Sequence, residues 1–191
     1  MKSDVASNSR ETILAVATRL AQARGYGGLN FRDIAEEVGI RNASMYYHFP
    51  SKADLGMAVA KRYWEDSVVA LDAILADAPN LQRCLDEYPD IFRRSLESDN
   101  RLCLGSFMSA EYDGLPETVK KEVQAFADVH VAWLSNVLSK ATGASATACV
   151  PRARAIYAAV AGAQLLARSR SDIELFDAVV ESYRDAGLFK A

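Results

Sequence analysis

The stretch Phe31–Phe49, FRDIAEEVGIRNASMYYHF, constrains the fold of this chain more than any other part of it. Its apolar residues are spaced so that two short helices meeting at a tight turn would bury them, and the small Ala35 lets the helices approach closely. Gly39 lies between the helices, where the turn needs a residue that accepts a positive φ. The pattern therefore predicts a helix-turn-helix with a core formed by Ile34, Val38, Ile40 and Met45.

The second of these helices, predicted from Asn42 to His48, carries polar, aromatic and cationic side chains on its outer face. A helix-turn-helix places the N-terminal half of its second helix against base edges in the major groove of DNA. The guanidinium of Arg41 matches the acceptors of guanine, and the amide of Asn42 matches adenine. Base contacts are predicted for Arg41, Asn42, Ser44 and Met45, and Arg32 in the preceding helix is a further candidate for a base or phosphate contact.

The longer segment LNFRDIAEEVGIRNASMYYHFPSKADL resembles the operator-binding signature of the tetracycline-repressor (TetR) family, most clearly in IAEEVGI followed by YYHFPSK and Leu55. This resemblance implies a dimeric repressor that leaves a palindromic DNA operator when its C-terminal domain binds a small-molecule inducer. It also implies phosphate contacts for Tyr46, Tyr47, His48 and Lys52. For each DNA-binding candidate the alternative is a solvated surface position, and for Tyr46 it is also a packing role.

The charge of the chain is divided unevenly. The net charge is −3, but residues 1–62 hold nine Lys and Arg against six Asp and Glu, whereas residues 63–191 hold thirteen against nineteen. Only the N-terminal segment has the sign that a phosphate backbone attracts. We therefore expect a DNA-binding domain over residues 1–62 and a ligand-binding and dimerisation domain over residues 63–191.

Apolar residues recur at helical spacing along the whole chain, and the sequence contains no β-hairpin signal. The predicted fold class is all-α, with an N-terminal three-helix helix-turn-helix domain and a C-terminal helical bundle. Asn8 and Glu11 suggest a capping box at the start of the first helix, and Pro89 must kink or split a later one. The expected helices run from Asn8 or Ser9 to Arg24, then from Phe31, over 42–48, from Ser51 to about Ala76, and over 81–98, 102–112, 116–143, 151–168 and 173–183, with a loop over 144–150.

The last two predicted helices, Pro151–Arg168 and Ile173–Tyr183, differ from the others in composition. The first is rich in alanine and apolar nearly all round, which indicates burial on more than one side. Such a helix pair from each of two subunits would form a four-helix interface, and the family resemblance also implies this homodimer. The alternative is an ordinary core hairpin in a monomer.

A ligand site is harder to predict than the DNA-binding face. Aromatic and sulfur-containing residues on three predicted helices would together line a mostly apolar cavity. The alternative is that these side chains, including the lone His130, form an ordinary core. The candidate ligand-binding residues are Tyr88, Phe92, Cys103, Phe107, Met108, Phe126, His130 and Trp133.

The three cysteines, Cys84, Cys103 and Cys149, are widely spaced and form no CxxC motif, so we expect free thiols and neither a metal site nor a cofactor. Cys103 in RLCLGSF lies at the start of a predicted helix beside Arg101, a setting that favours the thiolate. Some TetR-family sensors of electrophiles or oxidants carry a cysteine in a similar setting. Because Leu102 and Leu104 flank it, a buried core cysteine is the alternative.

Other classes of protein fit the sequence less well. An enzyme with Cys103 as nucleophile and His130 as base would need an orienting third residue, and none is evident, so we expect no catalytic activity. A helical adaptor for protein partners would not explain the basic first third of the chain. No run of apolar residues suggests a membrane span, and the N-terminus lacks an apolar signal region, which predicts a cytoplasmic protein.

Overall fold

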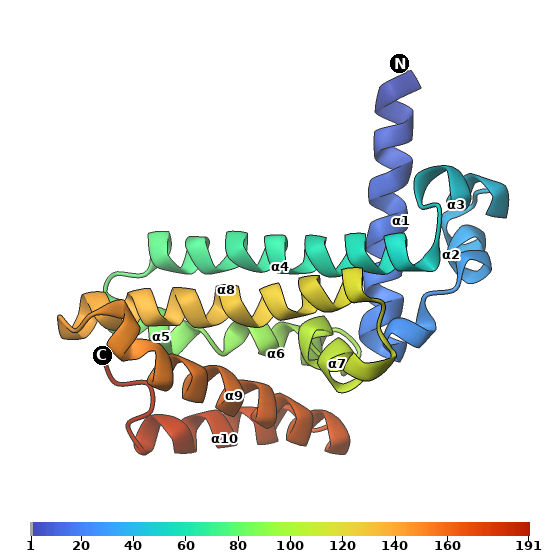
Figure 1. The fold of residues 1–191 in the computed structure, drawn as a ribbon. Coiled ribbons are helices and arrows are strands. Elements are labelled where there is room, and N and C mark those ends of the chain that lie inside the picture. The colour runs from blue at the N-terminus through green and yellow to red at the C-terminus, as the bar shows by residue number, and fades with distance from the viewer. Residues whose placement is uncertain (1) are drawn as a thin grey trace. The chain divides into compact units, whose positions relative to one another are not determined.

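The computed structural model describes the backbone of residues 2–191 and the side chains from Ser9 onward. This part of the chain is helical throughout and contains no strand, which confirms the predicted all-α class (Figure 1). None of its helices is long and apolar enough to cross a membrane. In chain order the elements are α1 (Lys2–Arg24), η1 (Tyr26–Gly28), α2 (Phe31–Val38), α3 (Asn42–His48), α4 (Lys52–Asp77), α5 (Leu81–Glu87), α6 (Asp90–Glu97), α7 (Leu104–Ala110), η2 (Tyr112–Gly114), α8 (Glu117–Thr142), α9 (Ala146–Arg170) and α10 (Ile173–Asp185).

The chain folds into two compact units. The first contains the residues up to Trp64 together with residues 104–124, and the second contains residues 65–103 and 125–191. The units therefore do not follow a single division after residue 62, because α7, η2 and the first turns of α8 join the N-terminal helices. Buried residues that these elements add to the core around α1, α2 and α3 are Leu104, Met108, Leu115, Val119 and Val123.

Local signals in the sequence fix the helix-turn-helix of the first unit. The Asn30 side chain accepts hydrogen bonds from the backbone N–H groups of Arg32 (2.8 Å) and Asp33 (3.4 Å), so α2 begins where the cap predicts. Gly39 ends α2 with φ 78°, in the left-handed region that the turn requires. The Ser51 hydroxyl accepts a hydrogen bond from the backbone N–H of Asp54 at 3.2 Å and so caps the start of α4. These predicted boundaries are confirmed.

The second unit contains the rest of α4 and α8 together with α5, α6, α9 and α10. Helices α9 and α10 form an antiparallel hairpin, joined by the short turn at Ser171 and Asp172 (Figure 1). Pro89 separates α5 from α6, which confirms the predicted split. Helix α6 packs against both α9 and α10, so the hairpin covers the element that contributes Phe92 to the core.

Two predicted helix starts are wrong. Helix α1 begins at Lys2, and Asn8 lies inside it, because no Pro or Gly interrupts the preceding polar residues; the side chain of Asn8 lies outside the described part. Helix α9 begins at Ala146, within the predicted loop, because the Ser145 side chain caps the N–H of Ala148 at 3.2 Å. Pro151 falls in the second turn of α9, where it removes one backbone donor without ending the helix.

Candidate DNA-binding face and buried aromatic cluster

Helix α3 turns most of its predicted DNA-binding side chains toward solvent. Tyr47 is 80% exposed and Tyr46 is 55% exposed, values that are unusual for large aromatic side chains. Arg41 and Asn42, at the N-terminal end of the helix, are also exposed, while Ser44 and His48 are half-buried. Exposed aromatic, amide and guanidinium groups on one short helix are the kinds of group that proteins use to contact bases and phosphates.

Met45 is an exception to the prediction of base contacts. Its side chain is 0% exposed and belongs to the core of the first unit, so the predicted contact with DNA is wrong. Phe49, four residues later, is also buried, because residues four apart lie on the same face of a helix. This inner face attaches α3 to the core and thereby orients its outer face.

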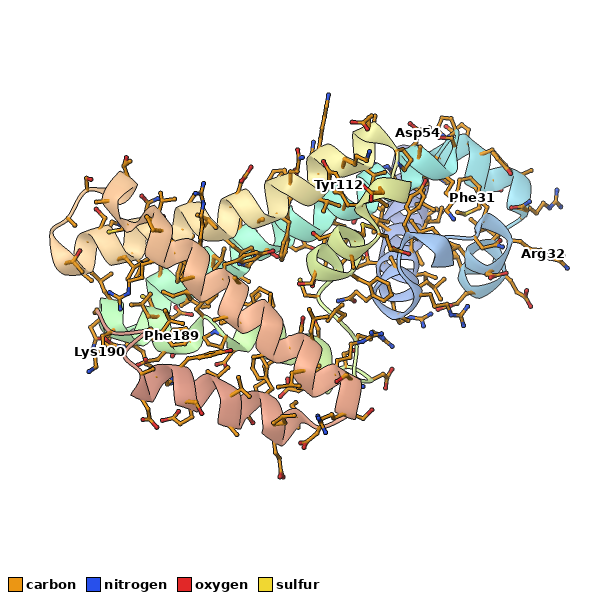
Figure 2. The ribbon with its side chains drawn as sticks, turned by 60° about the horizontal axis from the view of Figure 1, so that its bottom comes forward. Phe31, Arg32, Asp54, Tyr112, Phe189 and Lys190 are labelled. Atoms are coloured by element: carbon orange, nitrogen blue, oxygen red, sulfur yellow. The ribbon has the colours of Figure 1, made fainter. Side chains whose placement is uncertain are left out.

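A groove of about 370 Å³ lies where the starts of α2 and α4 approach α3. The rings of Phe31 and Tyr46 form one wall, with their centroids 5.0 Å apart. Figure 2 shows Arg32 extending outward from α2 while Phe31 points toward the neighbouring helices. The groove brings together four of the predicted DNA-binding residues, namely Arg32, Asn42, Tyr46 and Lys52.

Lys52 is positioned by a residue that the sequence did not single out. Its Nζ lies 4.8 Å from the centroid of the Tyr26 ring and donates a hydrogen bond to the Gly27 carbonyl at 3.3 Å. The backbone N–H of Tyr26 in turn donates to the Glu111 carboxylate at 2.7 Å. In the sequence, the only indication of the contact between Lys52 and Tyr26 was an aromatic residue in a YGG turn. Glu111 thus links the end of α7 to the turn that holds Lys52.

Comparison with known proteins agrees with this geometry. Residues 13–59 match the model of the bacterial regulatory proteins of the tetR family. A TetR transcriptional regulator from Legionella pneumophila has the same fold, with a TM-score of 0.85 and 30% identity over 92% of this chain and 95% of that chain. This chain belongs to the TetR family of transcriptional regulators. Its helix-turn-helix is accordingly a DNA-binding element.

Other relatives match this TetR-family regulator along nearly its whole length. A TetR-family transcriptional regulator from Agrobacterium tumefaciens superimposes with a TM-score of 0.87 and 27% identity, covering 95% of this chain and 98% of that chain. An uncharacterized HTH-type transcriptional regulator in the lacX 3' region of Lactococcus lactis is 28% identical over 94% of this chain and 95% of its own length. The similarity therefore extends through the second unit.

The second unit encloses a group of packed rings, which we call the aromatic cluster: Tyr88, Phe92, Phe126, His130, Trp133 and Tyr157. The rings of Phe126 and His130 are closest, with centroids 4.4 Å apart, and Tyr88 stacks on Trp133 at 5.9 Å. Five of the six residues are predicted ligand-binding residues. Tyr157 was missed because the alanines around it in α9 resemble a plain packing face.

Two polar atoms in the aromatic cluster lack a hydrogen-bond partner within the described part of the chain, namely Nε2 of His130 and Nε1 of Trp133. His130 is 0% exposed and Trp133 is 8% exposed. The other ring nitrogen of His130, Nδ1, lies 3.0 Å from the Tyr88 hydroxyl. Burial lowers the pKa of His130 to about 3, so the imidazole is neutral at pH 7. Burial also raises the pKa values of Tyr88 and Tyr157.

The remaining predicted ligand-binding residues lie outside the aromatic cluster. Phe107 and Met108 belong to the first unit, and Met108 is completely buried in its core. Cys103 belongs to the second unit and is 2% exposed, and its thiol helps to raise the pKa values of Tyr88 and Tyr157. Its placement is therefore that of a core residue beside the cluster.

A buried amide fixes the backbone at Cys103. The Gln164 side chain, 0% exposed, accepts a hydrogen bond from the Cys103 N–H at 3.1 Å and donates one to the Phe92 carbonyl at 2.6 Å. Both ends of the amide are thus satisfied, as a buried polar group requires. A single amide side chain in the mostly apolar stretch of α9 between Arg154 and Arg168 was the sequence signal for this link.

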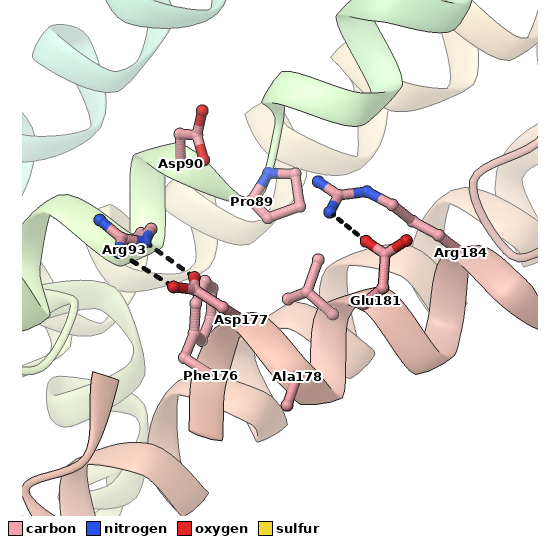
Figure 3. Close-up of a pocket in the computed structure, with 9 residues that line it drawn as sticks. Pro89, Asp90, Arg93, Phe176, Asp177, Ala178, Glu181 and Arg184 are labelled. Atoms are coloured by element: carbon pink, nitrogen blue, oxygen red, sulfur yellow. Dashed lines mark hydrogen bonds and ion pairs between the residues drawn. The ribbon is translucent and has the colours of Figure 1, made fainter. Parts of the chain in front are cut away.

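A second groove, of about 410 Å³, lies between α6 and α10 (Figure 3). Four of its charged side chains pair with one another: Arg93 binds Asp177 through two hydrogen bonds of 2.8 and 2.9 Å, and Arg184 binds Glu181 at 2.9 Å. These ion pairs join the two helices or brace α10. In the described part of the chain no cluster of His, Cys, Asp and Glu side chains could hold a metal ion.

Proposed function

We propose that this TetR-family regulator is a homodimeric repressor that leaves a palindromic operator when a small molecule binds its second unit. The observation that carries the proposal is the exposed polar face of α3, which belongs to a segment, residues 1–62, with nine Lys and Arg against six Asp and Glu. One helix-turn-helix reads about one half-site, so specific binding needs two copies. Such a regulator acts where the DNA is, which for a bacterial protein is the cytoplasm.

An exposed stripe on α9 supports the homodimer. Leu165 and Leu166 are 50% and 41% exposed, although large apolar side chains are usually covered. A Cβ atom added at Gly162 would meet nothing within 4 Å among the described residues. The stripe thus combines small and apolar side chains that allow close approach of a second helix, and its members are Ala155, Ala158, Gly162, Leu165 and Leu166. We propose that α9 and α10 of two copies form a four-helix interface.

The route of the chain supports a mechanism for release. The polypeptide passes between the two units three times, within α4, before α7 and within α8. We propose that a ligand and the operator select different arrangements of the second unit, and that these three segments transmit the difference. A ligand that bound both arrangements equally would not change DNA affinity.

Selection of bound sequences from random duplex DNA tests this function. We expect an enriched palindrome for the wild type and no enrichment for the Tyr47→Ala/Lys52→Ala variant, which should stay folded and dimeric. Lys140→Ala removes one exposed cation from the second unit and should leave selection unchanged. A protein that enriches no sequence would refute the proposal and favour a helical adaptor, or a thiol-dependent enzyme.

A further inference from the structure

The aromatic cluster carries chemistry that narrows the ligand class. Resting on the proposed function, we infer that the ligand is a neutral aromatic compound with a carbonyl or hydroxyl oxygen, which inserts among these rings and hydrogen-bonds to Trp133 Nε1 and His130 Nε2. The three features of this ligand follow from separate observations.

The need for an oxygen follows from the unpaired nitrogens. An indole N–H can only donate, so Trp133 requires an acceptor. When the Tyr88 hydroxyl donates to Nδ1 of His130, the proton of the neutral imidazole sits on Nε2, which makes a second donor in the same buried cluster. Buried donors without acceptors are costly and are rare in native proteins. One oxygen with two lone pairs can satisfy such donors, provided that the ligand brings it between them.

The aromatic character follows from the surroundings of these nitrogens. His130 alone has ring contacts with Tyr88, Phe92, Phe126 and Tyr157, at centroid separations from 4.4 to 5.8 Å. Planar rings prefer offset-stacked or edge-to-face partners at such distances. A flat aromatic ligand can therefore replace ring contacts within the cluster as it separates two of the side chains.

The inferred neutral charge of the ligand follows from the burial and the kinds of side chain of the aromatic cluster. Burial shifts the pKa of His130, and burial with Tyr157 and Cys103 shifts that of Tyr88. The six side chains of the aromatic cluster include no carboxylate, ammonium or guanidinium group. A charged ligand would lose its hydration without gaining a counter-charge. Because His130 stays neutral at pH 7, it does not supply a cation for a carboxylate ligand.

Calorimetric titration with matched probes tests the inference. Acetophenone and 2-acetylnaphthalene offer a carbonyl, benzoate and 2-naphthoate offer a charge, and α-methylstyrene has the planar shape of acetophenone with a CH2 group in place of its oxygen. We expect saturable binding of at least one ketone, and at least tenfold weaker binding of its carboxylate counterpart and of the hydrocarbon. Ketones that fail to bind, or carboxylates that bind as tightly, would overturn the inference.

Variants locate the binding site. In Trp64→Phe protein, Trp133 is the only tryptophan of the chain, so its fluorescence should change with ketone concentration. Trp133→Phe and His130→Phe keep a ring while removing a donor, and each should weaken ketone binding by about 2- to 10-fold. Unchanged affinity in both variants, with native circular dichroism, would refute the assigned hydrogen bonds.

The same titrations distinguish this inference from the proposed function. A ketone that binds the aromatic cluster without releasing operator DNA supports the ligand class and contradicts its role as inducer. A carboxylate that releases DNA supports the repressor and refutes the inferred ligand class. Release of DNA by a ketone, which needs a higher ketone concentration in the Trp133→Phe variant, supports both.

Discussion

Gly162 offers the sharpest test of the dimer, because the same substitution should have opposite effects on a single chain and on a pair of chains. Its position in α9 is exposed, and an added Cβ atom has open space among the described residues. Gly162→Leu should therefore fit the isolated fold and stabilise the helix by about 0.5 to 1 kcal/mol, the usual difference between glycine and a good helix former.

In a dimer packed through the α9 stripe, Gly162→Leu places a bulky side chain in each of two facing helices. Overpacking costs about 1 to 3 kcal/mol per site, so two copies should weaken the dimer by about 2 to 6 kcal/mol. This corresponds to a dimer dissociation constant raised by at least about 30-fold. Operator affinity should fall with it, because both half-sites must be occupied.

Sedimentation over a range of concentrations measures this effect directly. Ala132→Leu is the matched control, because it adds a leucine at an exposed alanine of α8, outside the α9–α10 pair. We expect Gly162→Leu to be monomeric at concentrations where the wild type and Ala132→Leu are dimeric. A Gly162→Leu protein with wild-type dimer affinity would refute the assignment of this stripe to the interface.

Three further predictions concern the DNA-binding face and the aromatic cluster. Met45→Ala should lower the free energy of unfolding by about 2 to 5 kcal/mol in urea titrations, because it leaves a cavity in the core. Tyr47→Ala should change the free energy of unfolding by less than about 0.5 kcal/mol and still abolish operator binding. Equal stabilities of the two variants would contradict the assigned burial of Met45. If each subunit neutralises about 3 to 5 phosphates, operator affinity in filter-binding assays should fall steeply with salt, with a log–log slope near −5 to −9; a slope near zero would exclude binding through phosphates. Because folding lowers the pKa of His130 from 6.5 to about 3, the unfolded chain binds one more proton than the folded chain between these pH values. The free energy of unfolding should therefore fall as the pH drops from 6.5 toward 3, by up to about 1.4 kcal/mol per pH unit. Urea titrations of His130→Phe should lack this pH dependence, and a pH profile identical to that of the wild type would show that folding leaves the pKa of His130 unchanged.

The parts of the fold that the sequence predicts correctly are those set by neighbours along the chain. Asn30 caps the helix that starts one residue later, and Gly39 adopts the positive φ that its turn requires. Pro89 separates α5 from α6 because a proline inside a helix removes a hydrogen bond and clashes with the preceding turn. Each of these effects acts over a few neighbouring residues, so the amino-acid sequence alone is enough to predict these helix boundaries.

The features that the sequence did not predict depend on packing between distant segments. Met108 was assigned to a ligand site because sequence spacing shows that a helix has an apolar face without showing which helix covers it. Met45 lies in the helix predicted to read DNA but has an apolar side chain, so the sequence allows either a base contact or a place in the core. The burial of Met45 assigns it to the core. The contact between Tyr26 and Glu111 joins residues 85 positions apart, which no local pattern indicates.

The inclusion of residues 104–124 in the first unit limits how regulators of this kind can be recombined. A chimera that exchanged only residues 1–62 would set a foreign α1 against Met108, Leu115 and Val119, side chains that are buried beneath the native helix-turn-helix. It would also lose the match between Glu111 and the turn at Tyr26. A transplant that keeps new operator specificity in a stable protein must therefore carry two separate pieces of the sequence, the N-terminal helices and the segment from Leu104 to Gln124.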